Sequence, residues 1–146
     1  MSTPIALERR GRLPLSQRIP ALLAVETARV VSALPPRYLY RFLRLIRNRA
    51  VAATEVEVHT ARDMITTASL RCAGEYCVQR SVATALLCRI HGVWPTWCVG
   101  VRTAPFTAHA WVAVGDNPIG EPYIAGDFQP IMTVEPTTVR GGENEG

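Results

Sequence analysis

Apolar residues in the first seventy positions recur at the three- and four-residue spacing that is typical of helices. This spacing predicts one helix from Leu15 to Leu34, with Ser16 as its N-cap and a double proline directly after it. A second helix, apolar on one face and rich in arginine on the other, is expected after this break, over about Arg37–Arg47. A third helix is expected over Thr54–Ala68. Residues 1–70 are therefore interpreted as a helical N-terminal region.

The pattern changes after Gly74. Apolar residues from Cys77 to His91 keep helical spacing, so a helix is expected to begin at Cys77 and to end at Gly92. Beyond this helix the apolar spacing becomes two, which is typical of strands. Four strands are expected, over Thr96–Arg102, Ala108–Val114, Ile119–Ile124 and Phe128–Val134.

This order of elements predicts an α+β fold. The helix that begins at Cys77 would pack on an antiparallel meander, and the two together would form a core over residues 71–136. Residues 137–146 are polar and rich in glycine, so we expect this tail to be disordered. The simplest organisation is one domain with a helical N-terminal extension.

The chain has 146 residues, which suits a single domain, and all 16 of its basic residues are arginine. Residues 1–50 hold ten Arg and two acidic residues, a net charge of +8. Residues 51–146 hold six Arg and ten acidic residues, a net charge of −4. A basic front is thus joined to an acidic body, which argues against a nucleic-acid-binding role for the chain as a whole.

The sequence predicts neither a membrane span nor a secretory signal. The longest apolar stretch near the front is Ala21–Val25, whereas a spanning helix needs about 20 such residues. A cleavage site of small residues does not follow it. We therefore expect a cytoplasmic protein with reduced thiols at its four cysteines, Cys72, Cys77, Cys88 and Cys98.

Cys77 is the candidate nucleophile because it stands at the start of the long helix. A helix N-terminus lowers the pKa of a thiol and offers free backbone N–H groups to an oxyanion. The general base would be His109, since a strand packed on the helix can bring its imidazole to the thiol. His91 is at the other end of the same helix, about 21 Å along the axis, and is too distant.

The imidazole needs an acceptor that fixes its orientation and stabilises its protonated form. Glu121 follows His109 across the turn at residues 115–117, so two adjacent strands would place the pair side by side. Asp127 is the alternative, and we prefer Glu121. Each of these residue types, taken alone, is more often structural than catalytic.

Two segments, CVQRSVATALLCRIHG and VGVRTAPFTAHAWVAVGDNPIGEP, resemble the leader peptidases of lasso-peptide biosynthesis, small members of the transglutaminase-like cysteine protease superfamily. The shared marks are Cys77 with Arg80 and Ser81, Gly-Val-Arg at 100–102, Pro-Phe at 105–106, Ala-His-Ala-Trp-Val at 108–112, and Glu121. Many relatives have Asp where this chain has Glu121. The resemblance implies a papain/transglutaminase-like core with a catalytic helix on an antiparallel sheet.

The resemblance also implies a function. Cys77 would be the nucleophile, His109 the general base and acid, and Glu121 the orienting carboxylate of a peptidase that needs no cofactor. The substrate would be a lasso-peptide precursor, whose leader is removed before a ring-closing cyclase acts. A separate leader-binding protein would be a partner, because residues 1–70 are helical rather than rich in strands. Candidate binding residues are Arg37, Arg41, Arg44 and Arg47 for the partner or an acidic leader, and Trp111 for the substrate pocket.

Two other classes of function compete with this interpretation. A metal site would draw on Cys72, Cys77, Cys88, His91 and Cys98, but their spacings do not match those of known zinc sites, so we expect none. A non-enzymatic module would use the basic helices to bind a protein partner or an anionic surface. Identifying a cleaved precursor would separate the peptidase from both.

Overall fold

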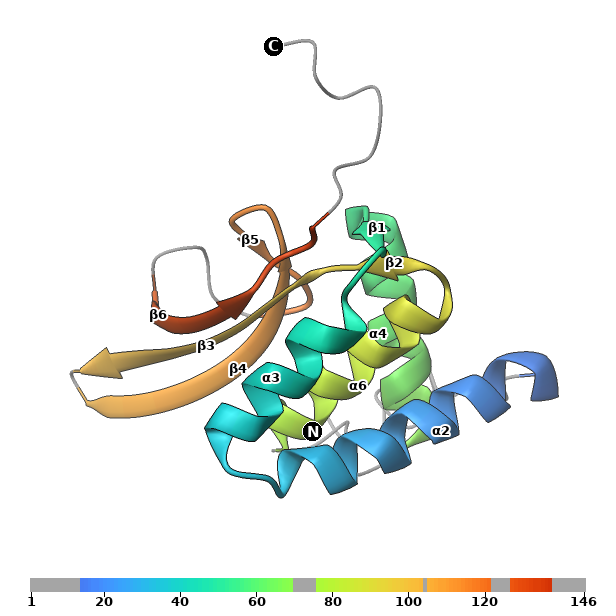
Figure 1. The fold of residues 1–146 in the computed structure, drawn as a ribbon, viewed down its shortest axis with the longest axis horizontal. Coiled ribbons are helices and arrows are strands. Elements are labelled where there is room, and N and C mark those ends of the chain that lie inside the picture. Colours follow the sequence, from blue (N-terminus) through green and yellow to red (C-terminus); the bar gives the residue numbers. More distant parts are fainter. Residues whose placement is uncertain (1–13, 70–75, 104, 122–126, 138–146) are drawn as a thin grey trace, which may run out of the picture.

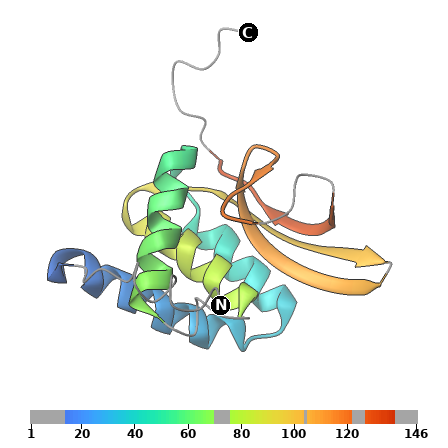
Figure 2. The same ribbon diagram turned by 180° about the vertical axis from the view of Figure 1, so that it is seen from behind.

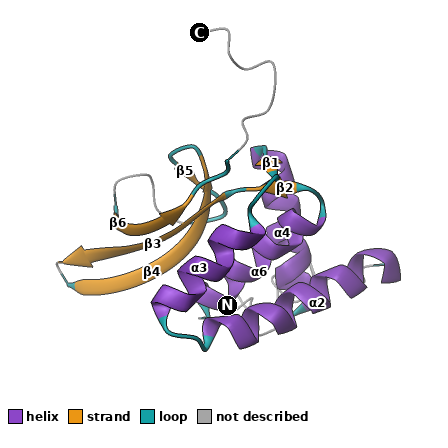
Figure 3. Cartoon of the chain, viewed as in Figure 1, coloured by secondary structure: helices purple, strands orange, loops and turns teal. Residues whose placement is uncertain are grey.

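The computed structural model describes residues 14–69, 76–103, 105–121 and 127–137. Within these residues, four helices lie on one side and a sheet lies on the other (Figures 1 and 3). The helices are α2 (Leu15–Ser32), α3 (Pro36–Ile46), α4 (Glu55–Ala68) and α6 (Cys77–Ile90). The strands are β1 (Val51–Ala52), β2 (Val93–Trp94), β3 (Thr96–Thr103), β4 (Phe106–Val114), β5 (Asn117–Pro118) and β6 (Gln129–Val134). The α+β prediction is confirmed.

The helix boundaries follow from local chemistry, with one correction to the predictions. The N-cap of α2 is Pro14 and makes no side-chain cap, so the assignment of Ser16 as the cap was wrong. Helix α3 begins at Pro36, because proline has the backbone angle and the missing N–H that suit a first helical residue. Helix α4 begins with a capping box, in which Thr54 and Glu57 satisfy each other's backbone N–H groups.

Helix α6 is the centre of the fold. Its residues from Ser81 to Cys88 are all buried, because α2, α4 and the sheet surround it. Figure 2 shows α6 between α4 and the strands. Helix α2 approaches α6 with a row of small residues, Ala21, Ala24 and Ala28, which are almost fully buried. A helix covered in this way holds its first residue, Cys77, at a fixed place against the sheet.

The sheet has the strand order β5-β4-β3-β6, with neighbouring strands antiparallel. The predicted meander was wrong for the last strand, because β6 lies beside β3 at the other edge instead of beside β5. The strand predicted from Ile119 is also wrong within the residues described. Gly120 has a φ of +72°, and this left-handed conformation turns the chain out of the sheet. The rest of that predicted strand lies outside the described residues.

A second, two-stranded sheet joins β1 to β2 in parallel. Each strand has only two residues, which is too short to produce a readable periodicity, so the sequence did not indicate it. Among the helices that the structure describes, none combines the length and apolar character needed to cross a membrane. The tail predicted to be disordered lies, beyond Thr137, outside the described residues.

Candidate active site

Cys77 is the first residue of α6, as the sequence predicts, and its side chain is half-buried. The first backbone hydrogen bond of this helix runs from the Arg80 N–H to the Tyr76 carbonyl. The N–H groups of the three residues before Arg80 therefore have no partner within the helix. They leave partial positive charge next to the thiol.

The sulfur of Cys77 lies against the outer edge of β4, the edge that faces away from β3. There the backbone N–H of Ala110 donates to it. This is possible because β5 is so short. Its pairing with β4 ends where the Ile119 N–H donates to the Val112 carbonyl, so no strand among the described residues pairs with Ala110 on that side.

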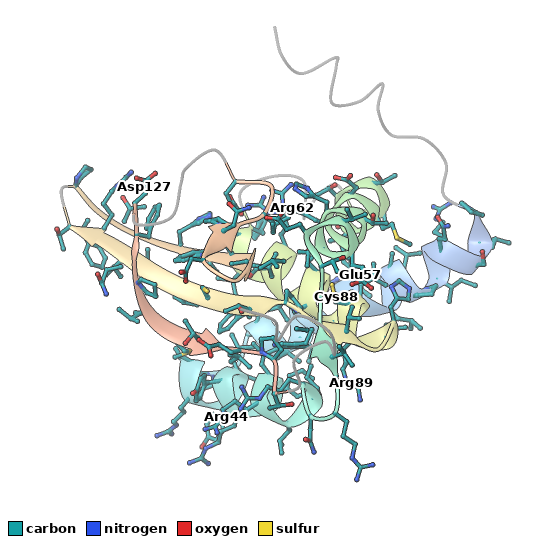
Figure 4. All side chains as sticks on the ribbon, turned by 90° about the horizontal axis from the view of Figure 1, so that it is seen from above. Arg44, Glu57, Arg62, Cys88, Arg89 and Asp127 are labelled. Atoms are coloured by element: carbon teal, nitrogen blue, oxygen red, sulfur yellow. The ribbon has the colours of Figure 1, made fainter. Side chains whose placement is uncertain are left out.

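His109 lies between the thiol and a carboxylate. Its imidazole is hydrogen-bonded to Cys77. Its Nε2 lies 3.3 Å from Oε2 of Glu121, whose side chain is only 6% exposed. Because Nε2 faces the carboxylate, Nδ1 is the nitrogen that remains for the sulfur. The structure thus brings together Cys77, His109 and Glu121, while Asp127 is exposed on the sheet side of the molecule (Figure 4).

The protonation of the pair follows from these contacts. The hydrogen bond from His109 lowers the pKa of Cys77 from its ordinary value, and the Ala110 N–H and the charges of His109 and Arg80 act in the same direction. Burial opposes them. The hydrogen bonds to Cys77 and Glu121 raise the pKa of His109 to about 9. Between these two pKa values the pair exists as a thiolate and an imidazolium.

The other described cysteines are chemically different. Burial raises the pKa of both Cys88 and Cys98 to about 12, and nearby carboxylates add to the effect. Figure 4 shows Cys88 in the interior beside Glu57 of α4. Both are therefore protonated thiols at neutral pH. Cys72 lies outside the described residues.

A family model described as the transglutaminase-like superfamily matches residues 21–133, which is most of the chain. The chain belongs to the transglutaminase-like superfamily. The match includes most of α2, all of α3, α4 and α6, and nearly all of the sheet. No curated protein and no solved structure gives a significant match.

In this transglutaminase-like chain a second contact holds Glu121. Its Oε1 lies 3.9 Å from the Arg80 guanidinium, and the Arg80 side chain is 13% exposed. The carboxylate is thus bound on one oxygen by the imidazole and on the other by a residue of the nucleophile helix. The sequence pattern includes Arg80 but does not predict a role for it. Its position three residues after Cys77, on the same face of a helix, was the available signal.

Replacing Arg80 with glutamine should slow the alkylation of Cys77 by iodoacetamide at pH 7 about three- to tenfold, because the carboxylate that orients His109 loses its anchor and the thiolate loses a nearby positive charge. Combining Arg80→Gln with Glu121→Gln should be little slower than Glu121→Gln alone. Rates measured from pH 5 to pH 10 test this. Fully additive losses would show that Arg80 does not act through Glu121.

His109 also belongs to an aromatic cluster. Its ring stacks on Trp111 with centroids 6.2 Å apart and lies 5.5 Å from the Phe128 ring. Trp111 is only 5% exposed and packs in a buried cluster with Cys98, Ala113 and Phe128. The role predicted for Trp111 in substrate binding stays a prediction. Phe128 was missed by sequence reasoning, because it meets His109 only through the pairing of β6 beside β3.

Gly100 makes room for this cluster. It lies opposite His109 on β3, and a Cβ there would be 2.7 Å from the tip of the Trp111 indole and 2.8 Å from the Gln129 carbonyl oxygen. Only glycine allows the indole to lie this close to the strand. The Gly-Val-Arg mark in the sequence therefore has a steric reason.

Replacing Gly100 with alanine should destabilise the protein by about 1–3 kcal/mol, because neither the indole nor the carbonyl can give way without disturbing the sheet. Urea unfolding measures this. Thr103→Ala, at an exposed position of the same strand, is the matched control and should change the free energy of unfolding by less than about 0.5 kcal/mol. Equal stability of the two variants would refute the close contact.

The arginine stripe of α3, defined as Arg37, Arg41, Arg44 and Arg47, divides into two parts. The first three side chains are exposed, and Figure 4 shows Arg44 projecting away from the body of the molecule. Arg47 is partly buried and donates to the Glu135 carbonyl at 2.6 Å, so it anchors the end of β6.

Within the described part of the chain, no three His, Cys, Asp or Glu side chains gather closely enough to hold a metal ion.

Proposed function

We propose that this protein is a cysteine peptidase that removes the leader from a lasso-peptide precursor. The superfamily includes cysteine peptidases. The observation that carries the proposal is the hydrogen-bonded row of Cys77, His109 and Glu121, with the pKa of the thiol lowered and that of the imidazole raised. Such an ion pair supplies a nucleophile and a proton donor in one contact.

In the proposed reaction the Cys77 thiolate attacks the carbonyl carbon of the scissile peptide bond, and a carbon–sulfur bond forms. The N–H groups of the first turn of α6, which have no partner within the helix, would stabilise the resulting oxyanion. The His109 imidazolium then gives its proton to the amine that leaves as the carbon–nitrogen bond breaks. In the second half, neutral His109 takes a proton from water, which attacks the thioester and releases the acid and the thiolate.

The residues that carry the resemblance to leader peptidases gather around the proposed site. Arg80 binds the carboxylate of Glu121, and Gly100 accommodates Trp111 under His109. Ser81 donates to the Val78 carbonyl and accepts from the indole N–H of Trp97, which ties α6 to β3. These marks act around one site, as the marks of a shared reaction would.

The test is to incubate the purified protein with a lasso-peptide precursor and its leader-binding protein, and to identify products by mass. One cut between leader and core peptide, dependent on the wild-type protein, is the expected result. Binding of the precursor or partner without any cut would contradict the proposal and favour a non-enzymatic interaction module.

The exposed arginines of α3 are the proposed contact with the leader-binding protein or with an acidic leader. Replacing Arg41 and Arg44 together with glutamate should weaken this association about tenfold or more at low salt, because two attractions become repulsions. Titration calorimetry measures it. Arg18→Glu, an exposed reversal on α2, is the control. If the control and the double variant lose affinity equally, the contact is not specific to α3.

A further inference from the structure

Helix α4 contacts the segment that leads into Glu121. The side-chain amide of Asn117, in β5, donates to a carboxylate oxygen of Glu55 in the first turn of α4. Arg62, seven residues further along α4 and so about two turns away on the same face, lies against Gly120. Figure 4 shows the Arg62 side chain on the side of α4 that faces β5. The stretch from residue 117 to residue 120 is therefore held against α4 at both ends.

Arg62 covers the backbone of Gly120 with the length of its side chain rather than with its tip. A Cβ at Gly120 would be 2.7 Å from both Cδ and Nε of Arg62 and 2.8 Å from its Cζ. These are three consecutive atoms, so the side chain lies flat over the residue. Gly120 also has a φ of +72°, a conformation that glycine adopts readily. Glycine at this position thus permits both the bend of the chain and the close approach of Arg62.

The bend at Gly120 sets the direction of Glu121. Up to Ile119 the segment is fixed by the sheet and the core, since the Ile119 N–H donates to the Val112 carbonyl and the Ile119 side chain is buried. Gly120 then turns the chain, and Glu121 follows directly. Because Arg62 packs on this one residue, it is placed to hold the turn.

The contacts of the Glu121 carboxylate leave little room for displacement. Its Oε2 is 3.3 Å from Nε2 of His109, and its Oε1 is 3.9 Å from the Arg80 guanidinium. A typical hydrogen bond from nitrogen to oxygen is about 2.9 Å long, and the attraction weakens with further separation. A shift of the Glu121 backbone away from the site would break both contacts. Whatever fixes the bend therefore decides whether the carboxylate reaches the imidazole.

We propose that Arg62 is a positioning residue, which packs over Gly120 and so holds the bend that presents the Glu121 carboxylate to His109. This inference rests on the proposed peptidase function, in which Glu121 orients the base. Arg62 acts through the stem of its side chain, because Cδ and Nε lie closest to Gly120. Helix α4 then supports the acid of the site, while α6 carries the thiol and β4 the imidazole.

Replacing Arg62 with alanine should slow the alkylation of Cys77 by iodoacetamide at pH 7 about threefold or more, because a displaced Glu121 orients His109 less well and the pKa of the thiol rises. The loss should disappear near pH 9, where the thiol is ionised in both proteins. A general loss of stability would not produce this pH dependence. Arg62 is half-buried on a helix and alanine favours helix, so the variant should fold, which circular dichroism checks.

Three further variants make the test specific. Arg62→Met keeps an unbranched stem over Gly120 without the charge and should react within about twofold of the wild type. Arg18→Ala, which removes an exposed arginine of α2, should do the same. Adding Arg62→Ala to Glu121→Gln should cause little further loss, because both act through the same carboxylate. Additive losses, or a loss in Arg62→Met equal to that in Arg62→Ala, would overturn positioning through the stem.

The position of Glu121 can also be measured apart from any reaction of the thiol. The contact with Glu121 raises the pKa of His109, so adding Arg62→Ala to a Cys77→Ala background should lower that pKa, and adding Arg62→Met should not. Titration of the imidazole by NMR measures this. An unchanged pKa in the Arg62→Ala protein would overturn the role of Arg62. The expected fall in this pKa, together with slow alkylation of wild-type Cys77 at pH 7, would support that role and reject the peptidase mechanism instead.

Discussion

Replacing Cys77 with alanine should abolish cleavage of the precursor, lowering kcat/KM by about a thousandfold or more. The reason is that the carbon–sulfur bond of the acyl-enzyme cannot form, and the other described thiols, Cys88 and Cys98, are buried and protonated. The fold should survive, because the Cys77 side chain is only half-buried. Cleavage is measured by mass spectrometry and folding by thermal unfolding.

The control is Cys98→Ala, which removes a thiol on β3. Burial raises the pKa of this thiol to about 12, so it is not ionised at neutral pH. Its cleavage rate should stay within about twofold of the wild type. Undiminished cleavage by Cys77→Ala would remove the proposed nucleophile. Loss of cleavage in Cys98→Ala with an unchanged unfolding temperature would point to a different thiol.

Replacing His109 with glutamine should slow the alkylation of Cys77 at pH 7 by up to about a hundredfold. The hydrogen bond from His109 is the largest cause that lowers the pKa of the thiol, so without it that pKa moves toward the ordinary value of 9.0. A thiol with this pKa is about 1% ionised at pH 7. The variant should therefore lose reactivity about tenfold for each pH unit below 9, measured with iodoacetamide from pH 5 to pH 10.

In the wild type the same profile should stay nearly flat from pH 9 down to the lowered pKa of Cys77. Peptide cleavage should also fall above about pH 9, because His109 then loses the proton that the leaving amine needs.

Glu121→Gln should lower the rate of cleavage less than His109→Gln, since it removes only the orienting acceptor. Asp127→Asn is the control for that carboxylate. A loss in Asp127→Asn with Glu121→Gln unchanged would move the orienting role to Asp127.

Two features bring the Cys77 thiol to the His109 imidazole: the burial of α6 and the shortness of β5. Residues Ser81–Cys88 are all buried, so α6 is held in the core. This fixes the position of Cys77, its first residue, relative to the sheet. The turn after Val114 is tight and β5 ends after Pro118, which leaves the Ala110 N–H open to the sulfur. A longer β5 would have used that N–H in a ladder and kept the thiol away.

The sequence by itself determined the main helices and strands, and the order in which the candidate catalytic residues occur along them. Helical spacing ending at Gly92, followed by alternation in Thr96–Arg102 and Ala108–Val114, identified α6, β3 and β4 to within a few residues. These signals are readable because they are periodic over many residues and arise from burial on one face. They also indicated that a cysteine opens a helix and that a histidine follows on a strand.

Tertiary structure alone decided how these elements meet. Strand β6 lies on the far side of β3 and brings Phe128 to His109. The left-handed turn at Gly120 directs Glu121 out of the sheet, toward the imidazole and Arg80. The small parallel pair β1–β2 has the same origin. Pairing of distant segments depends on which edges and faces remain uncovered after the core has packed, and no local periodicity records that outcome.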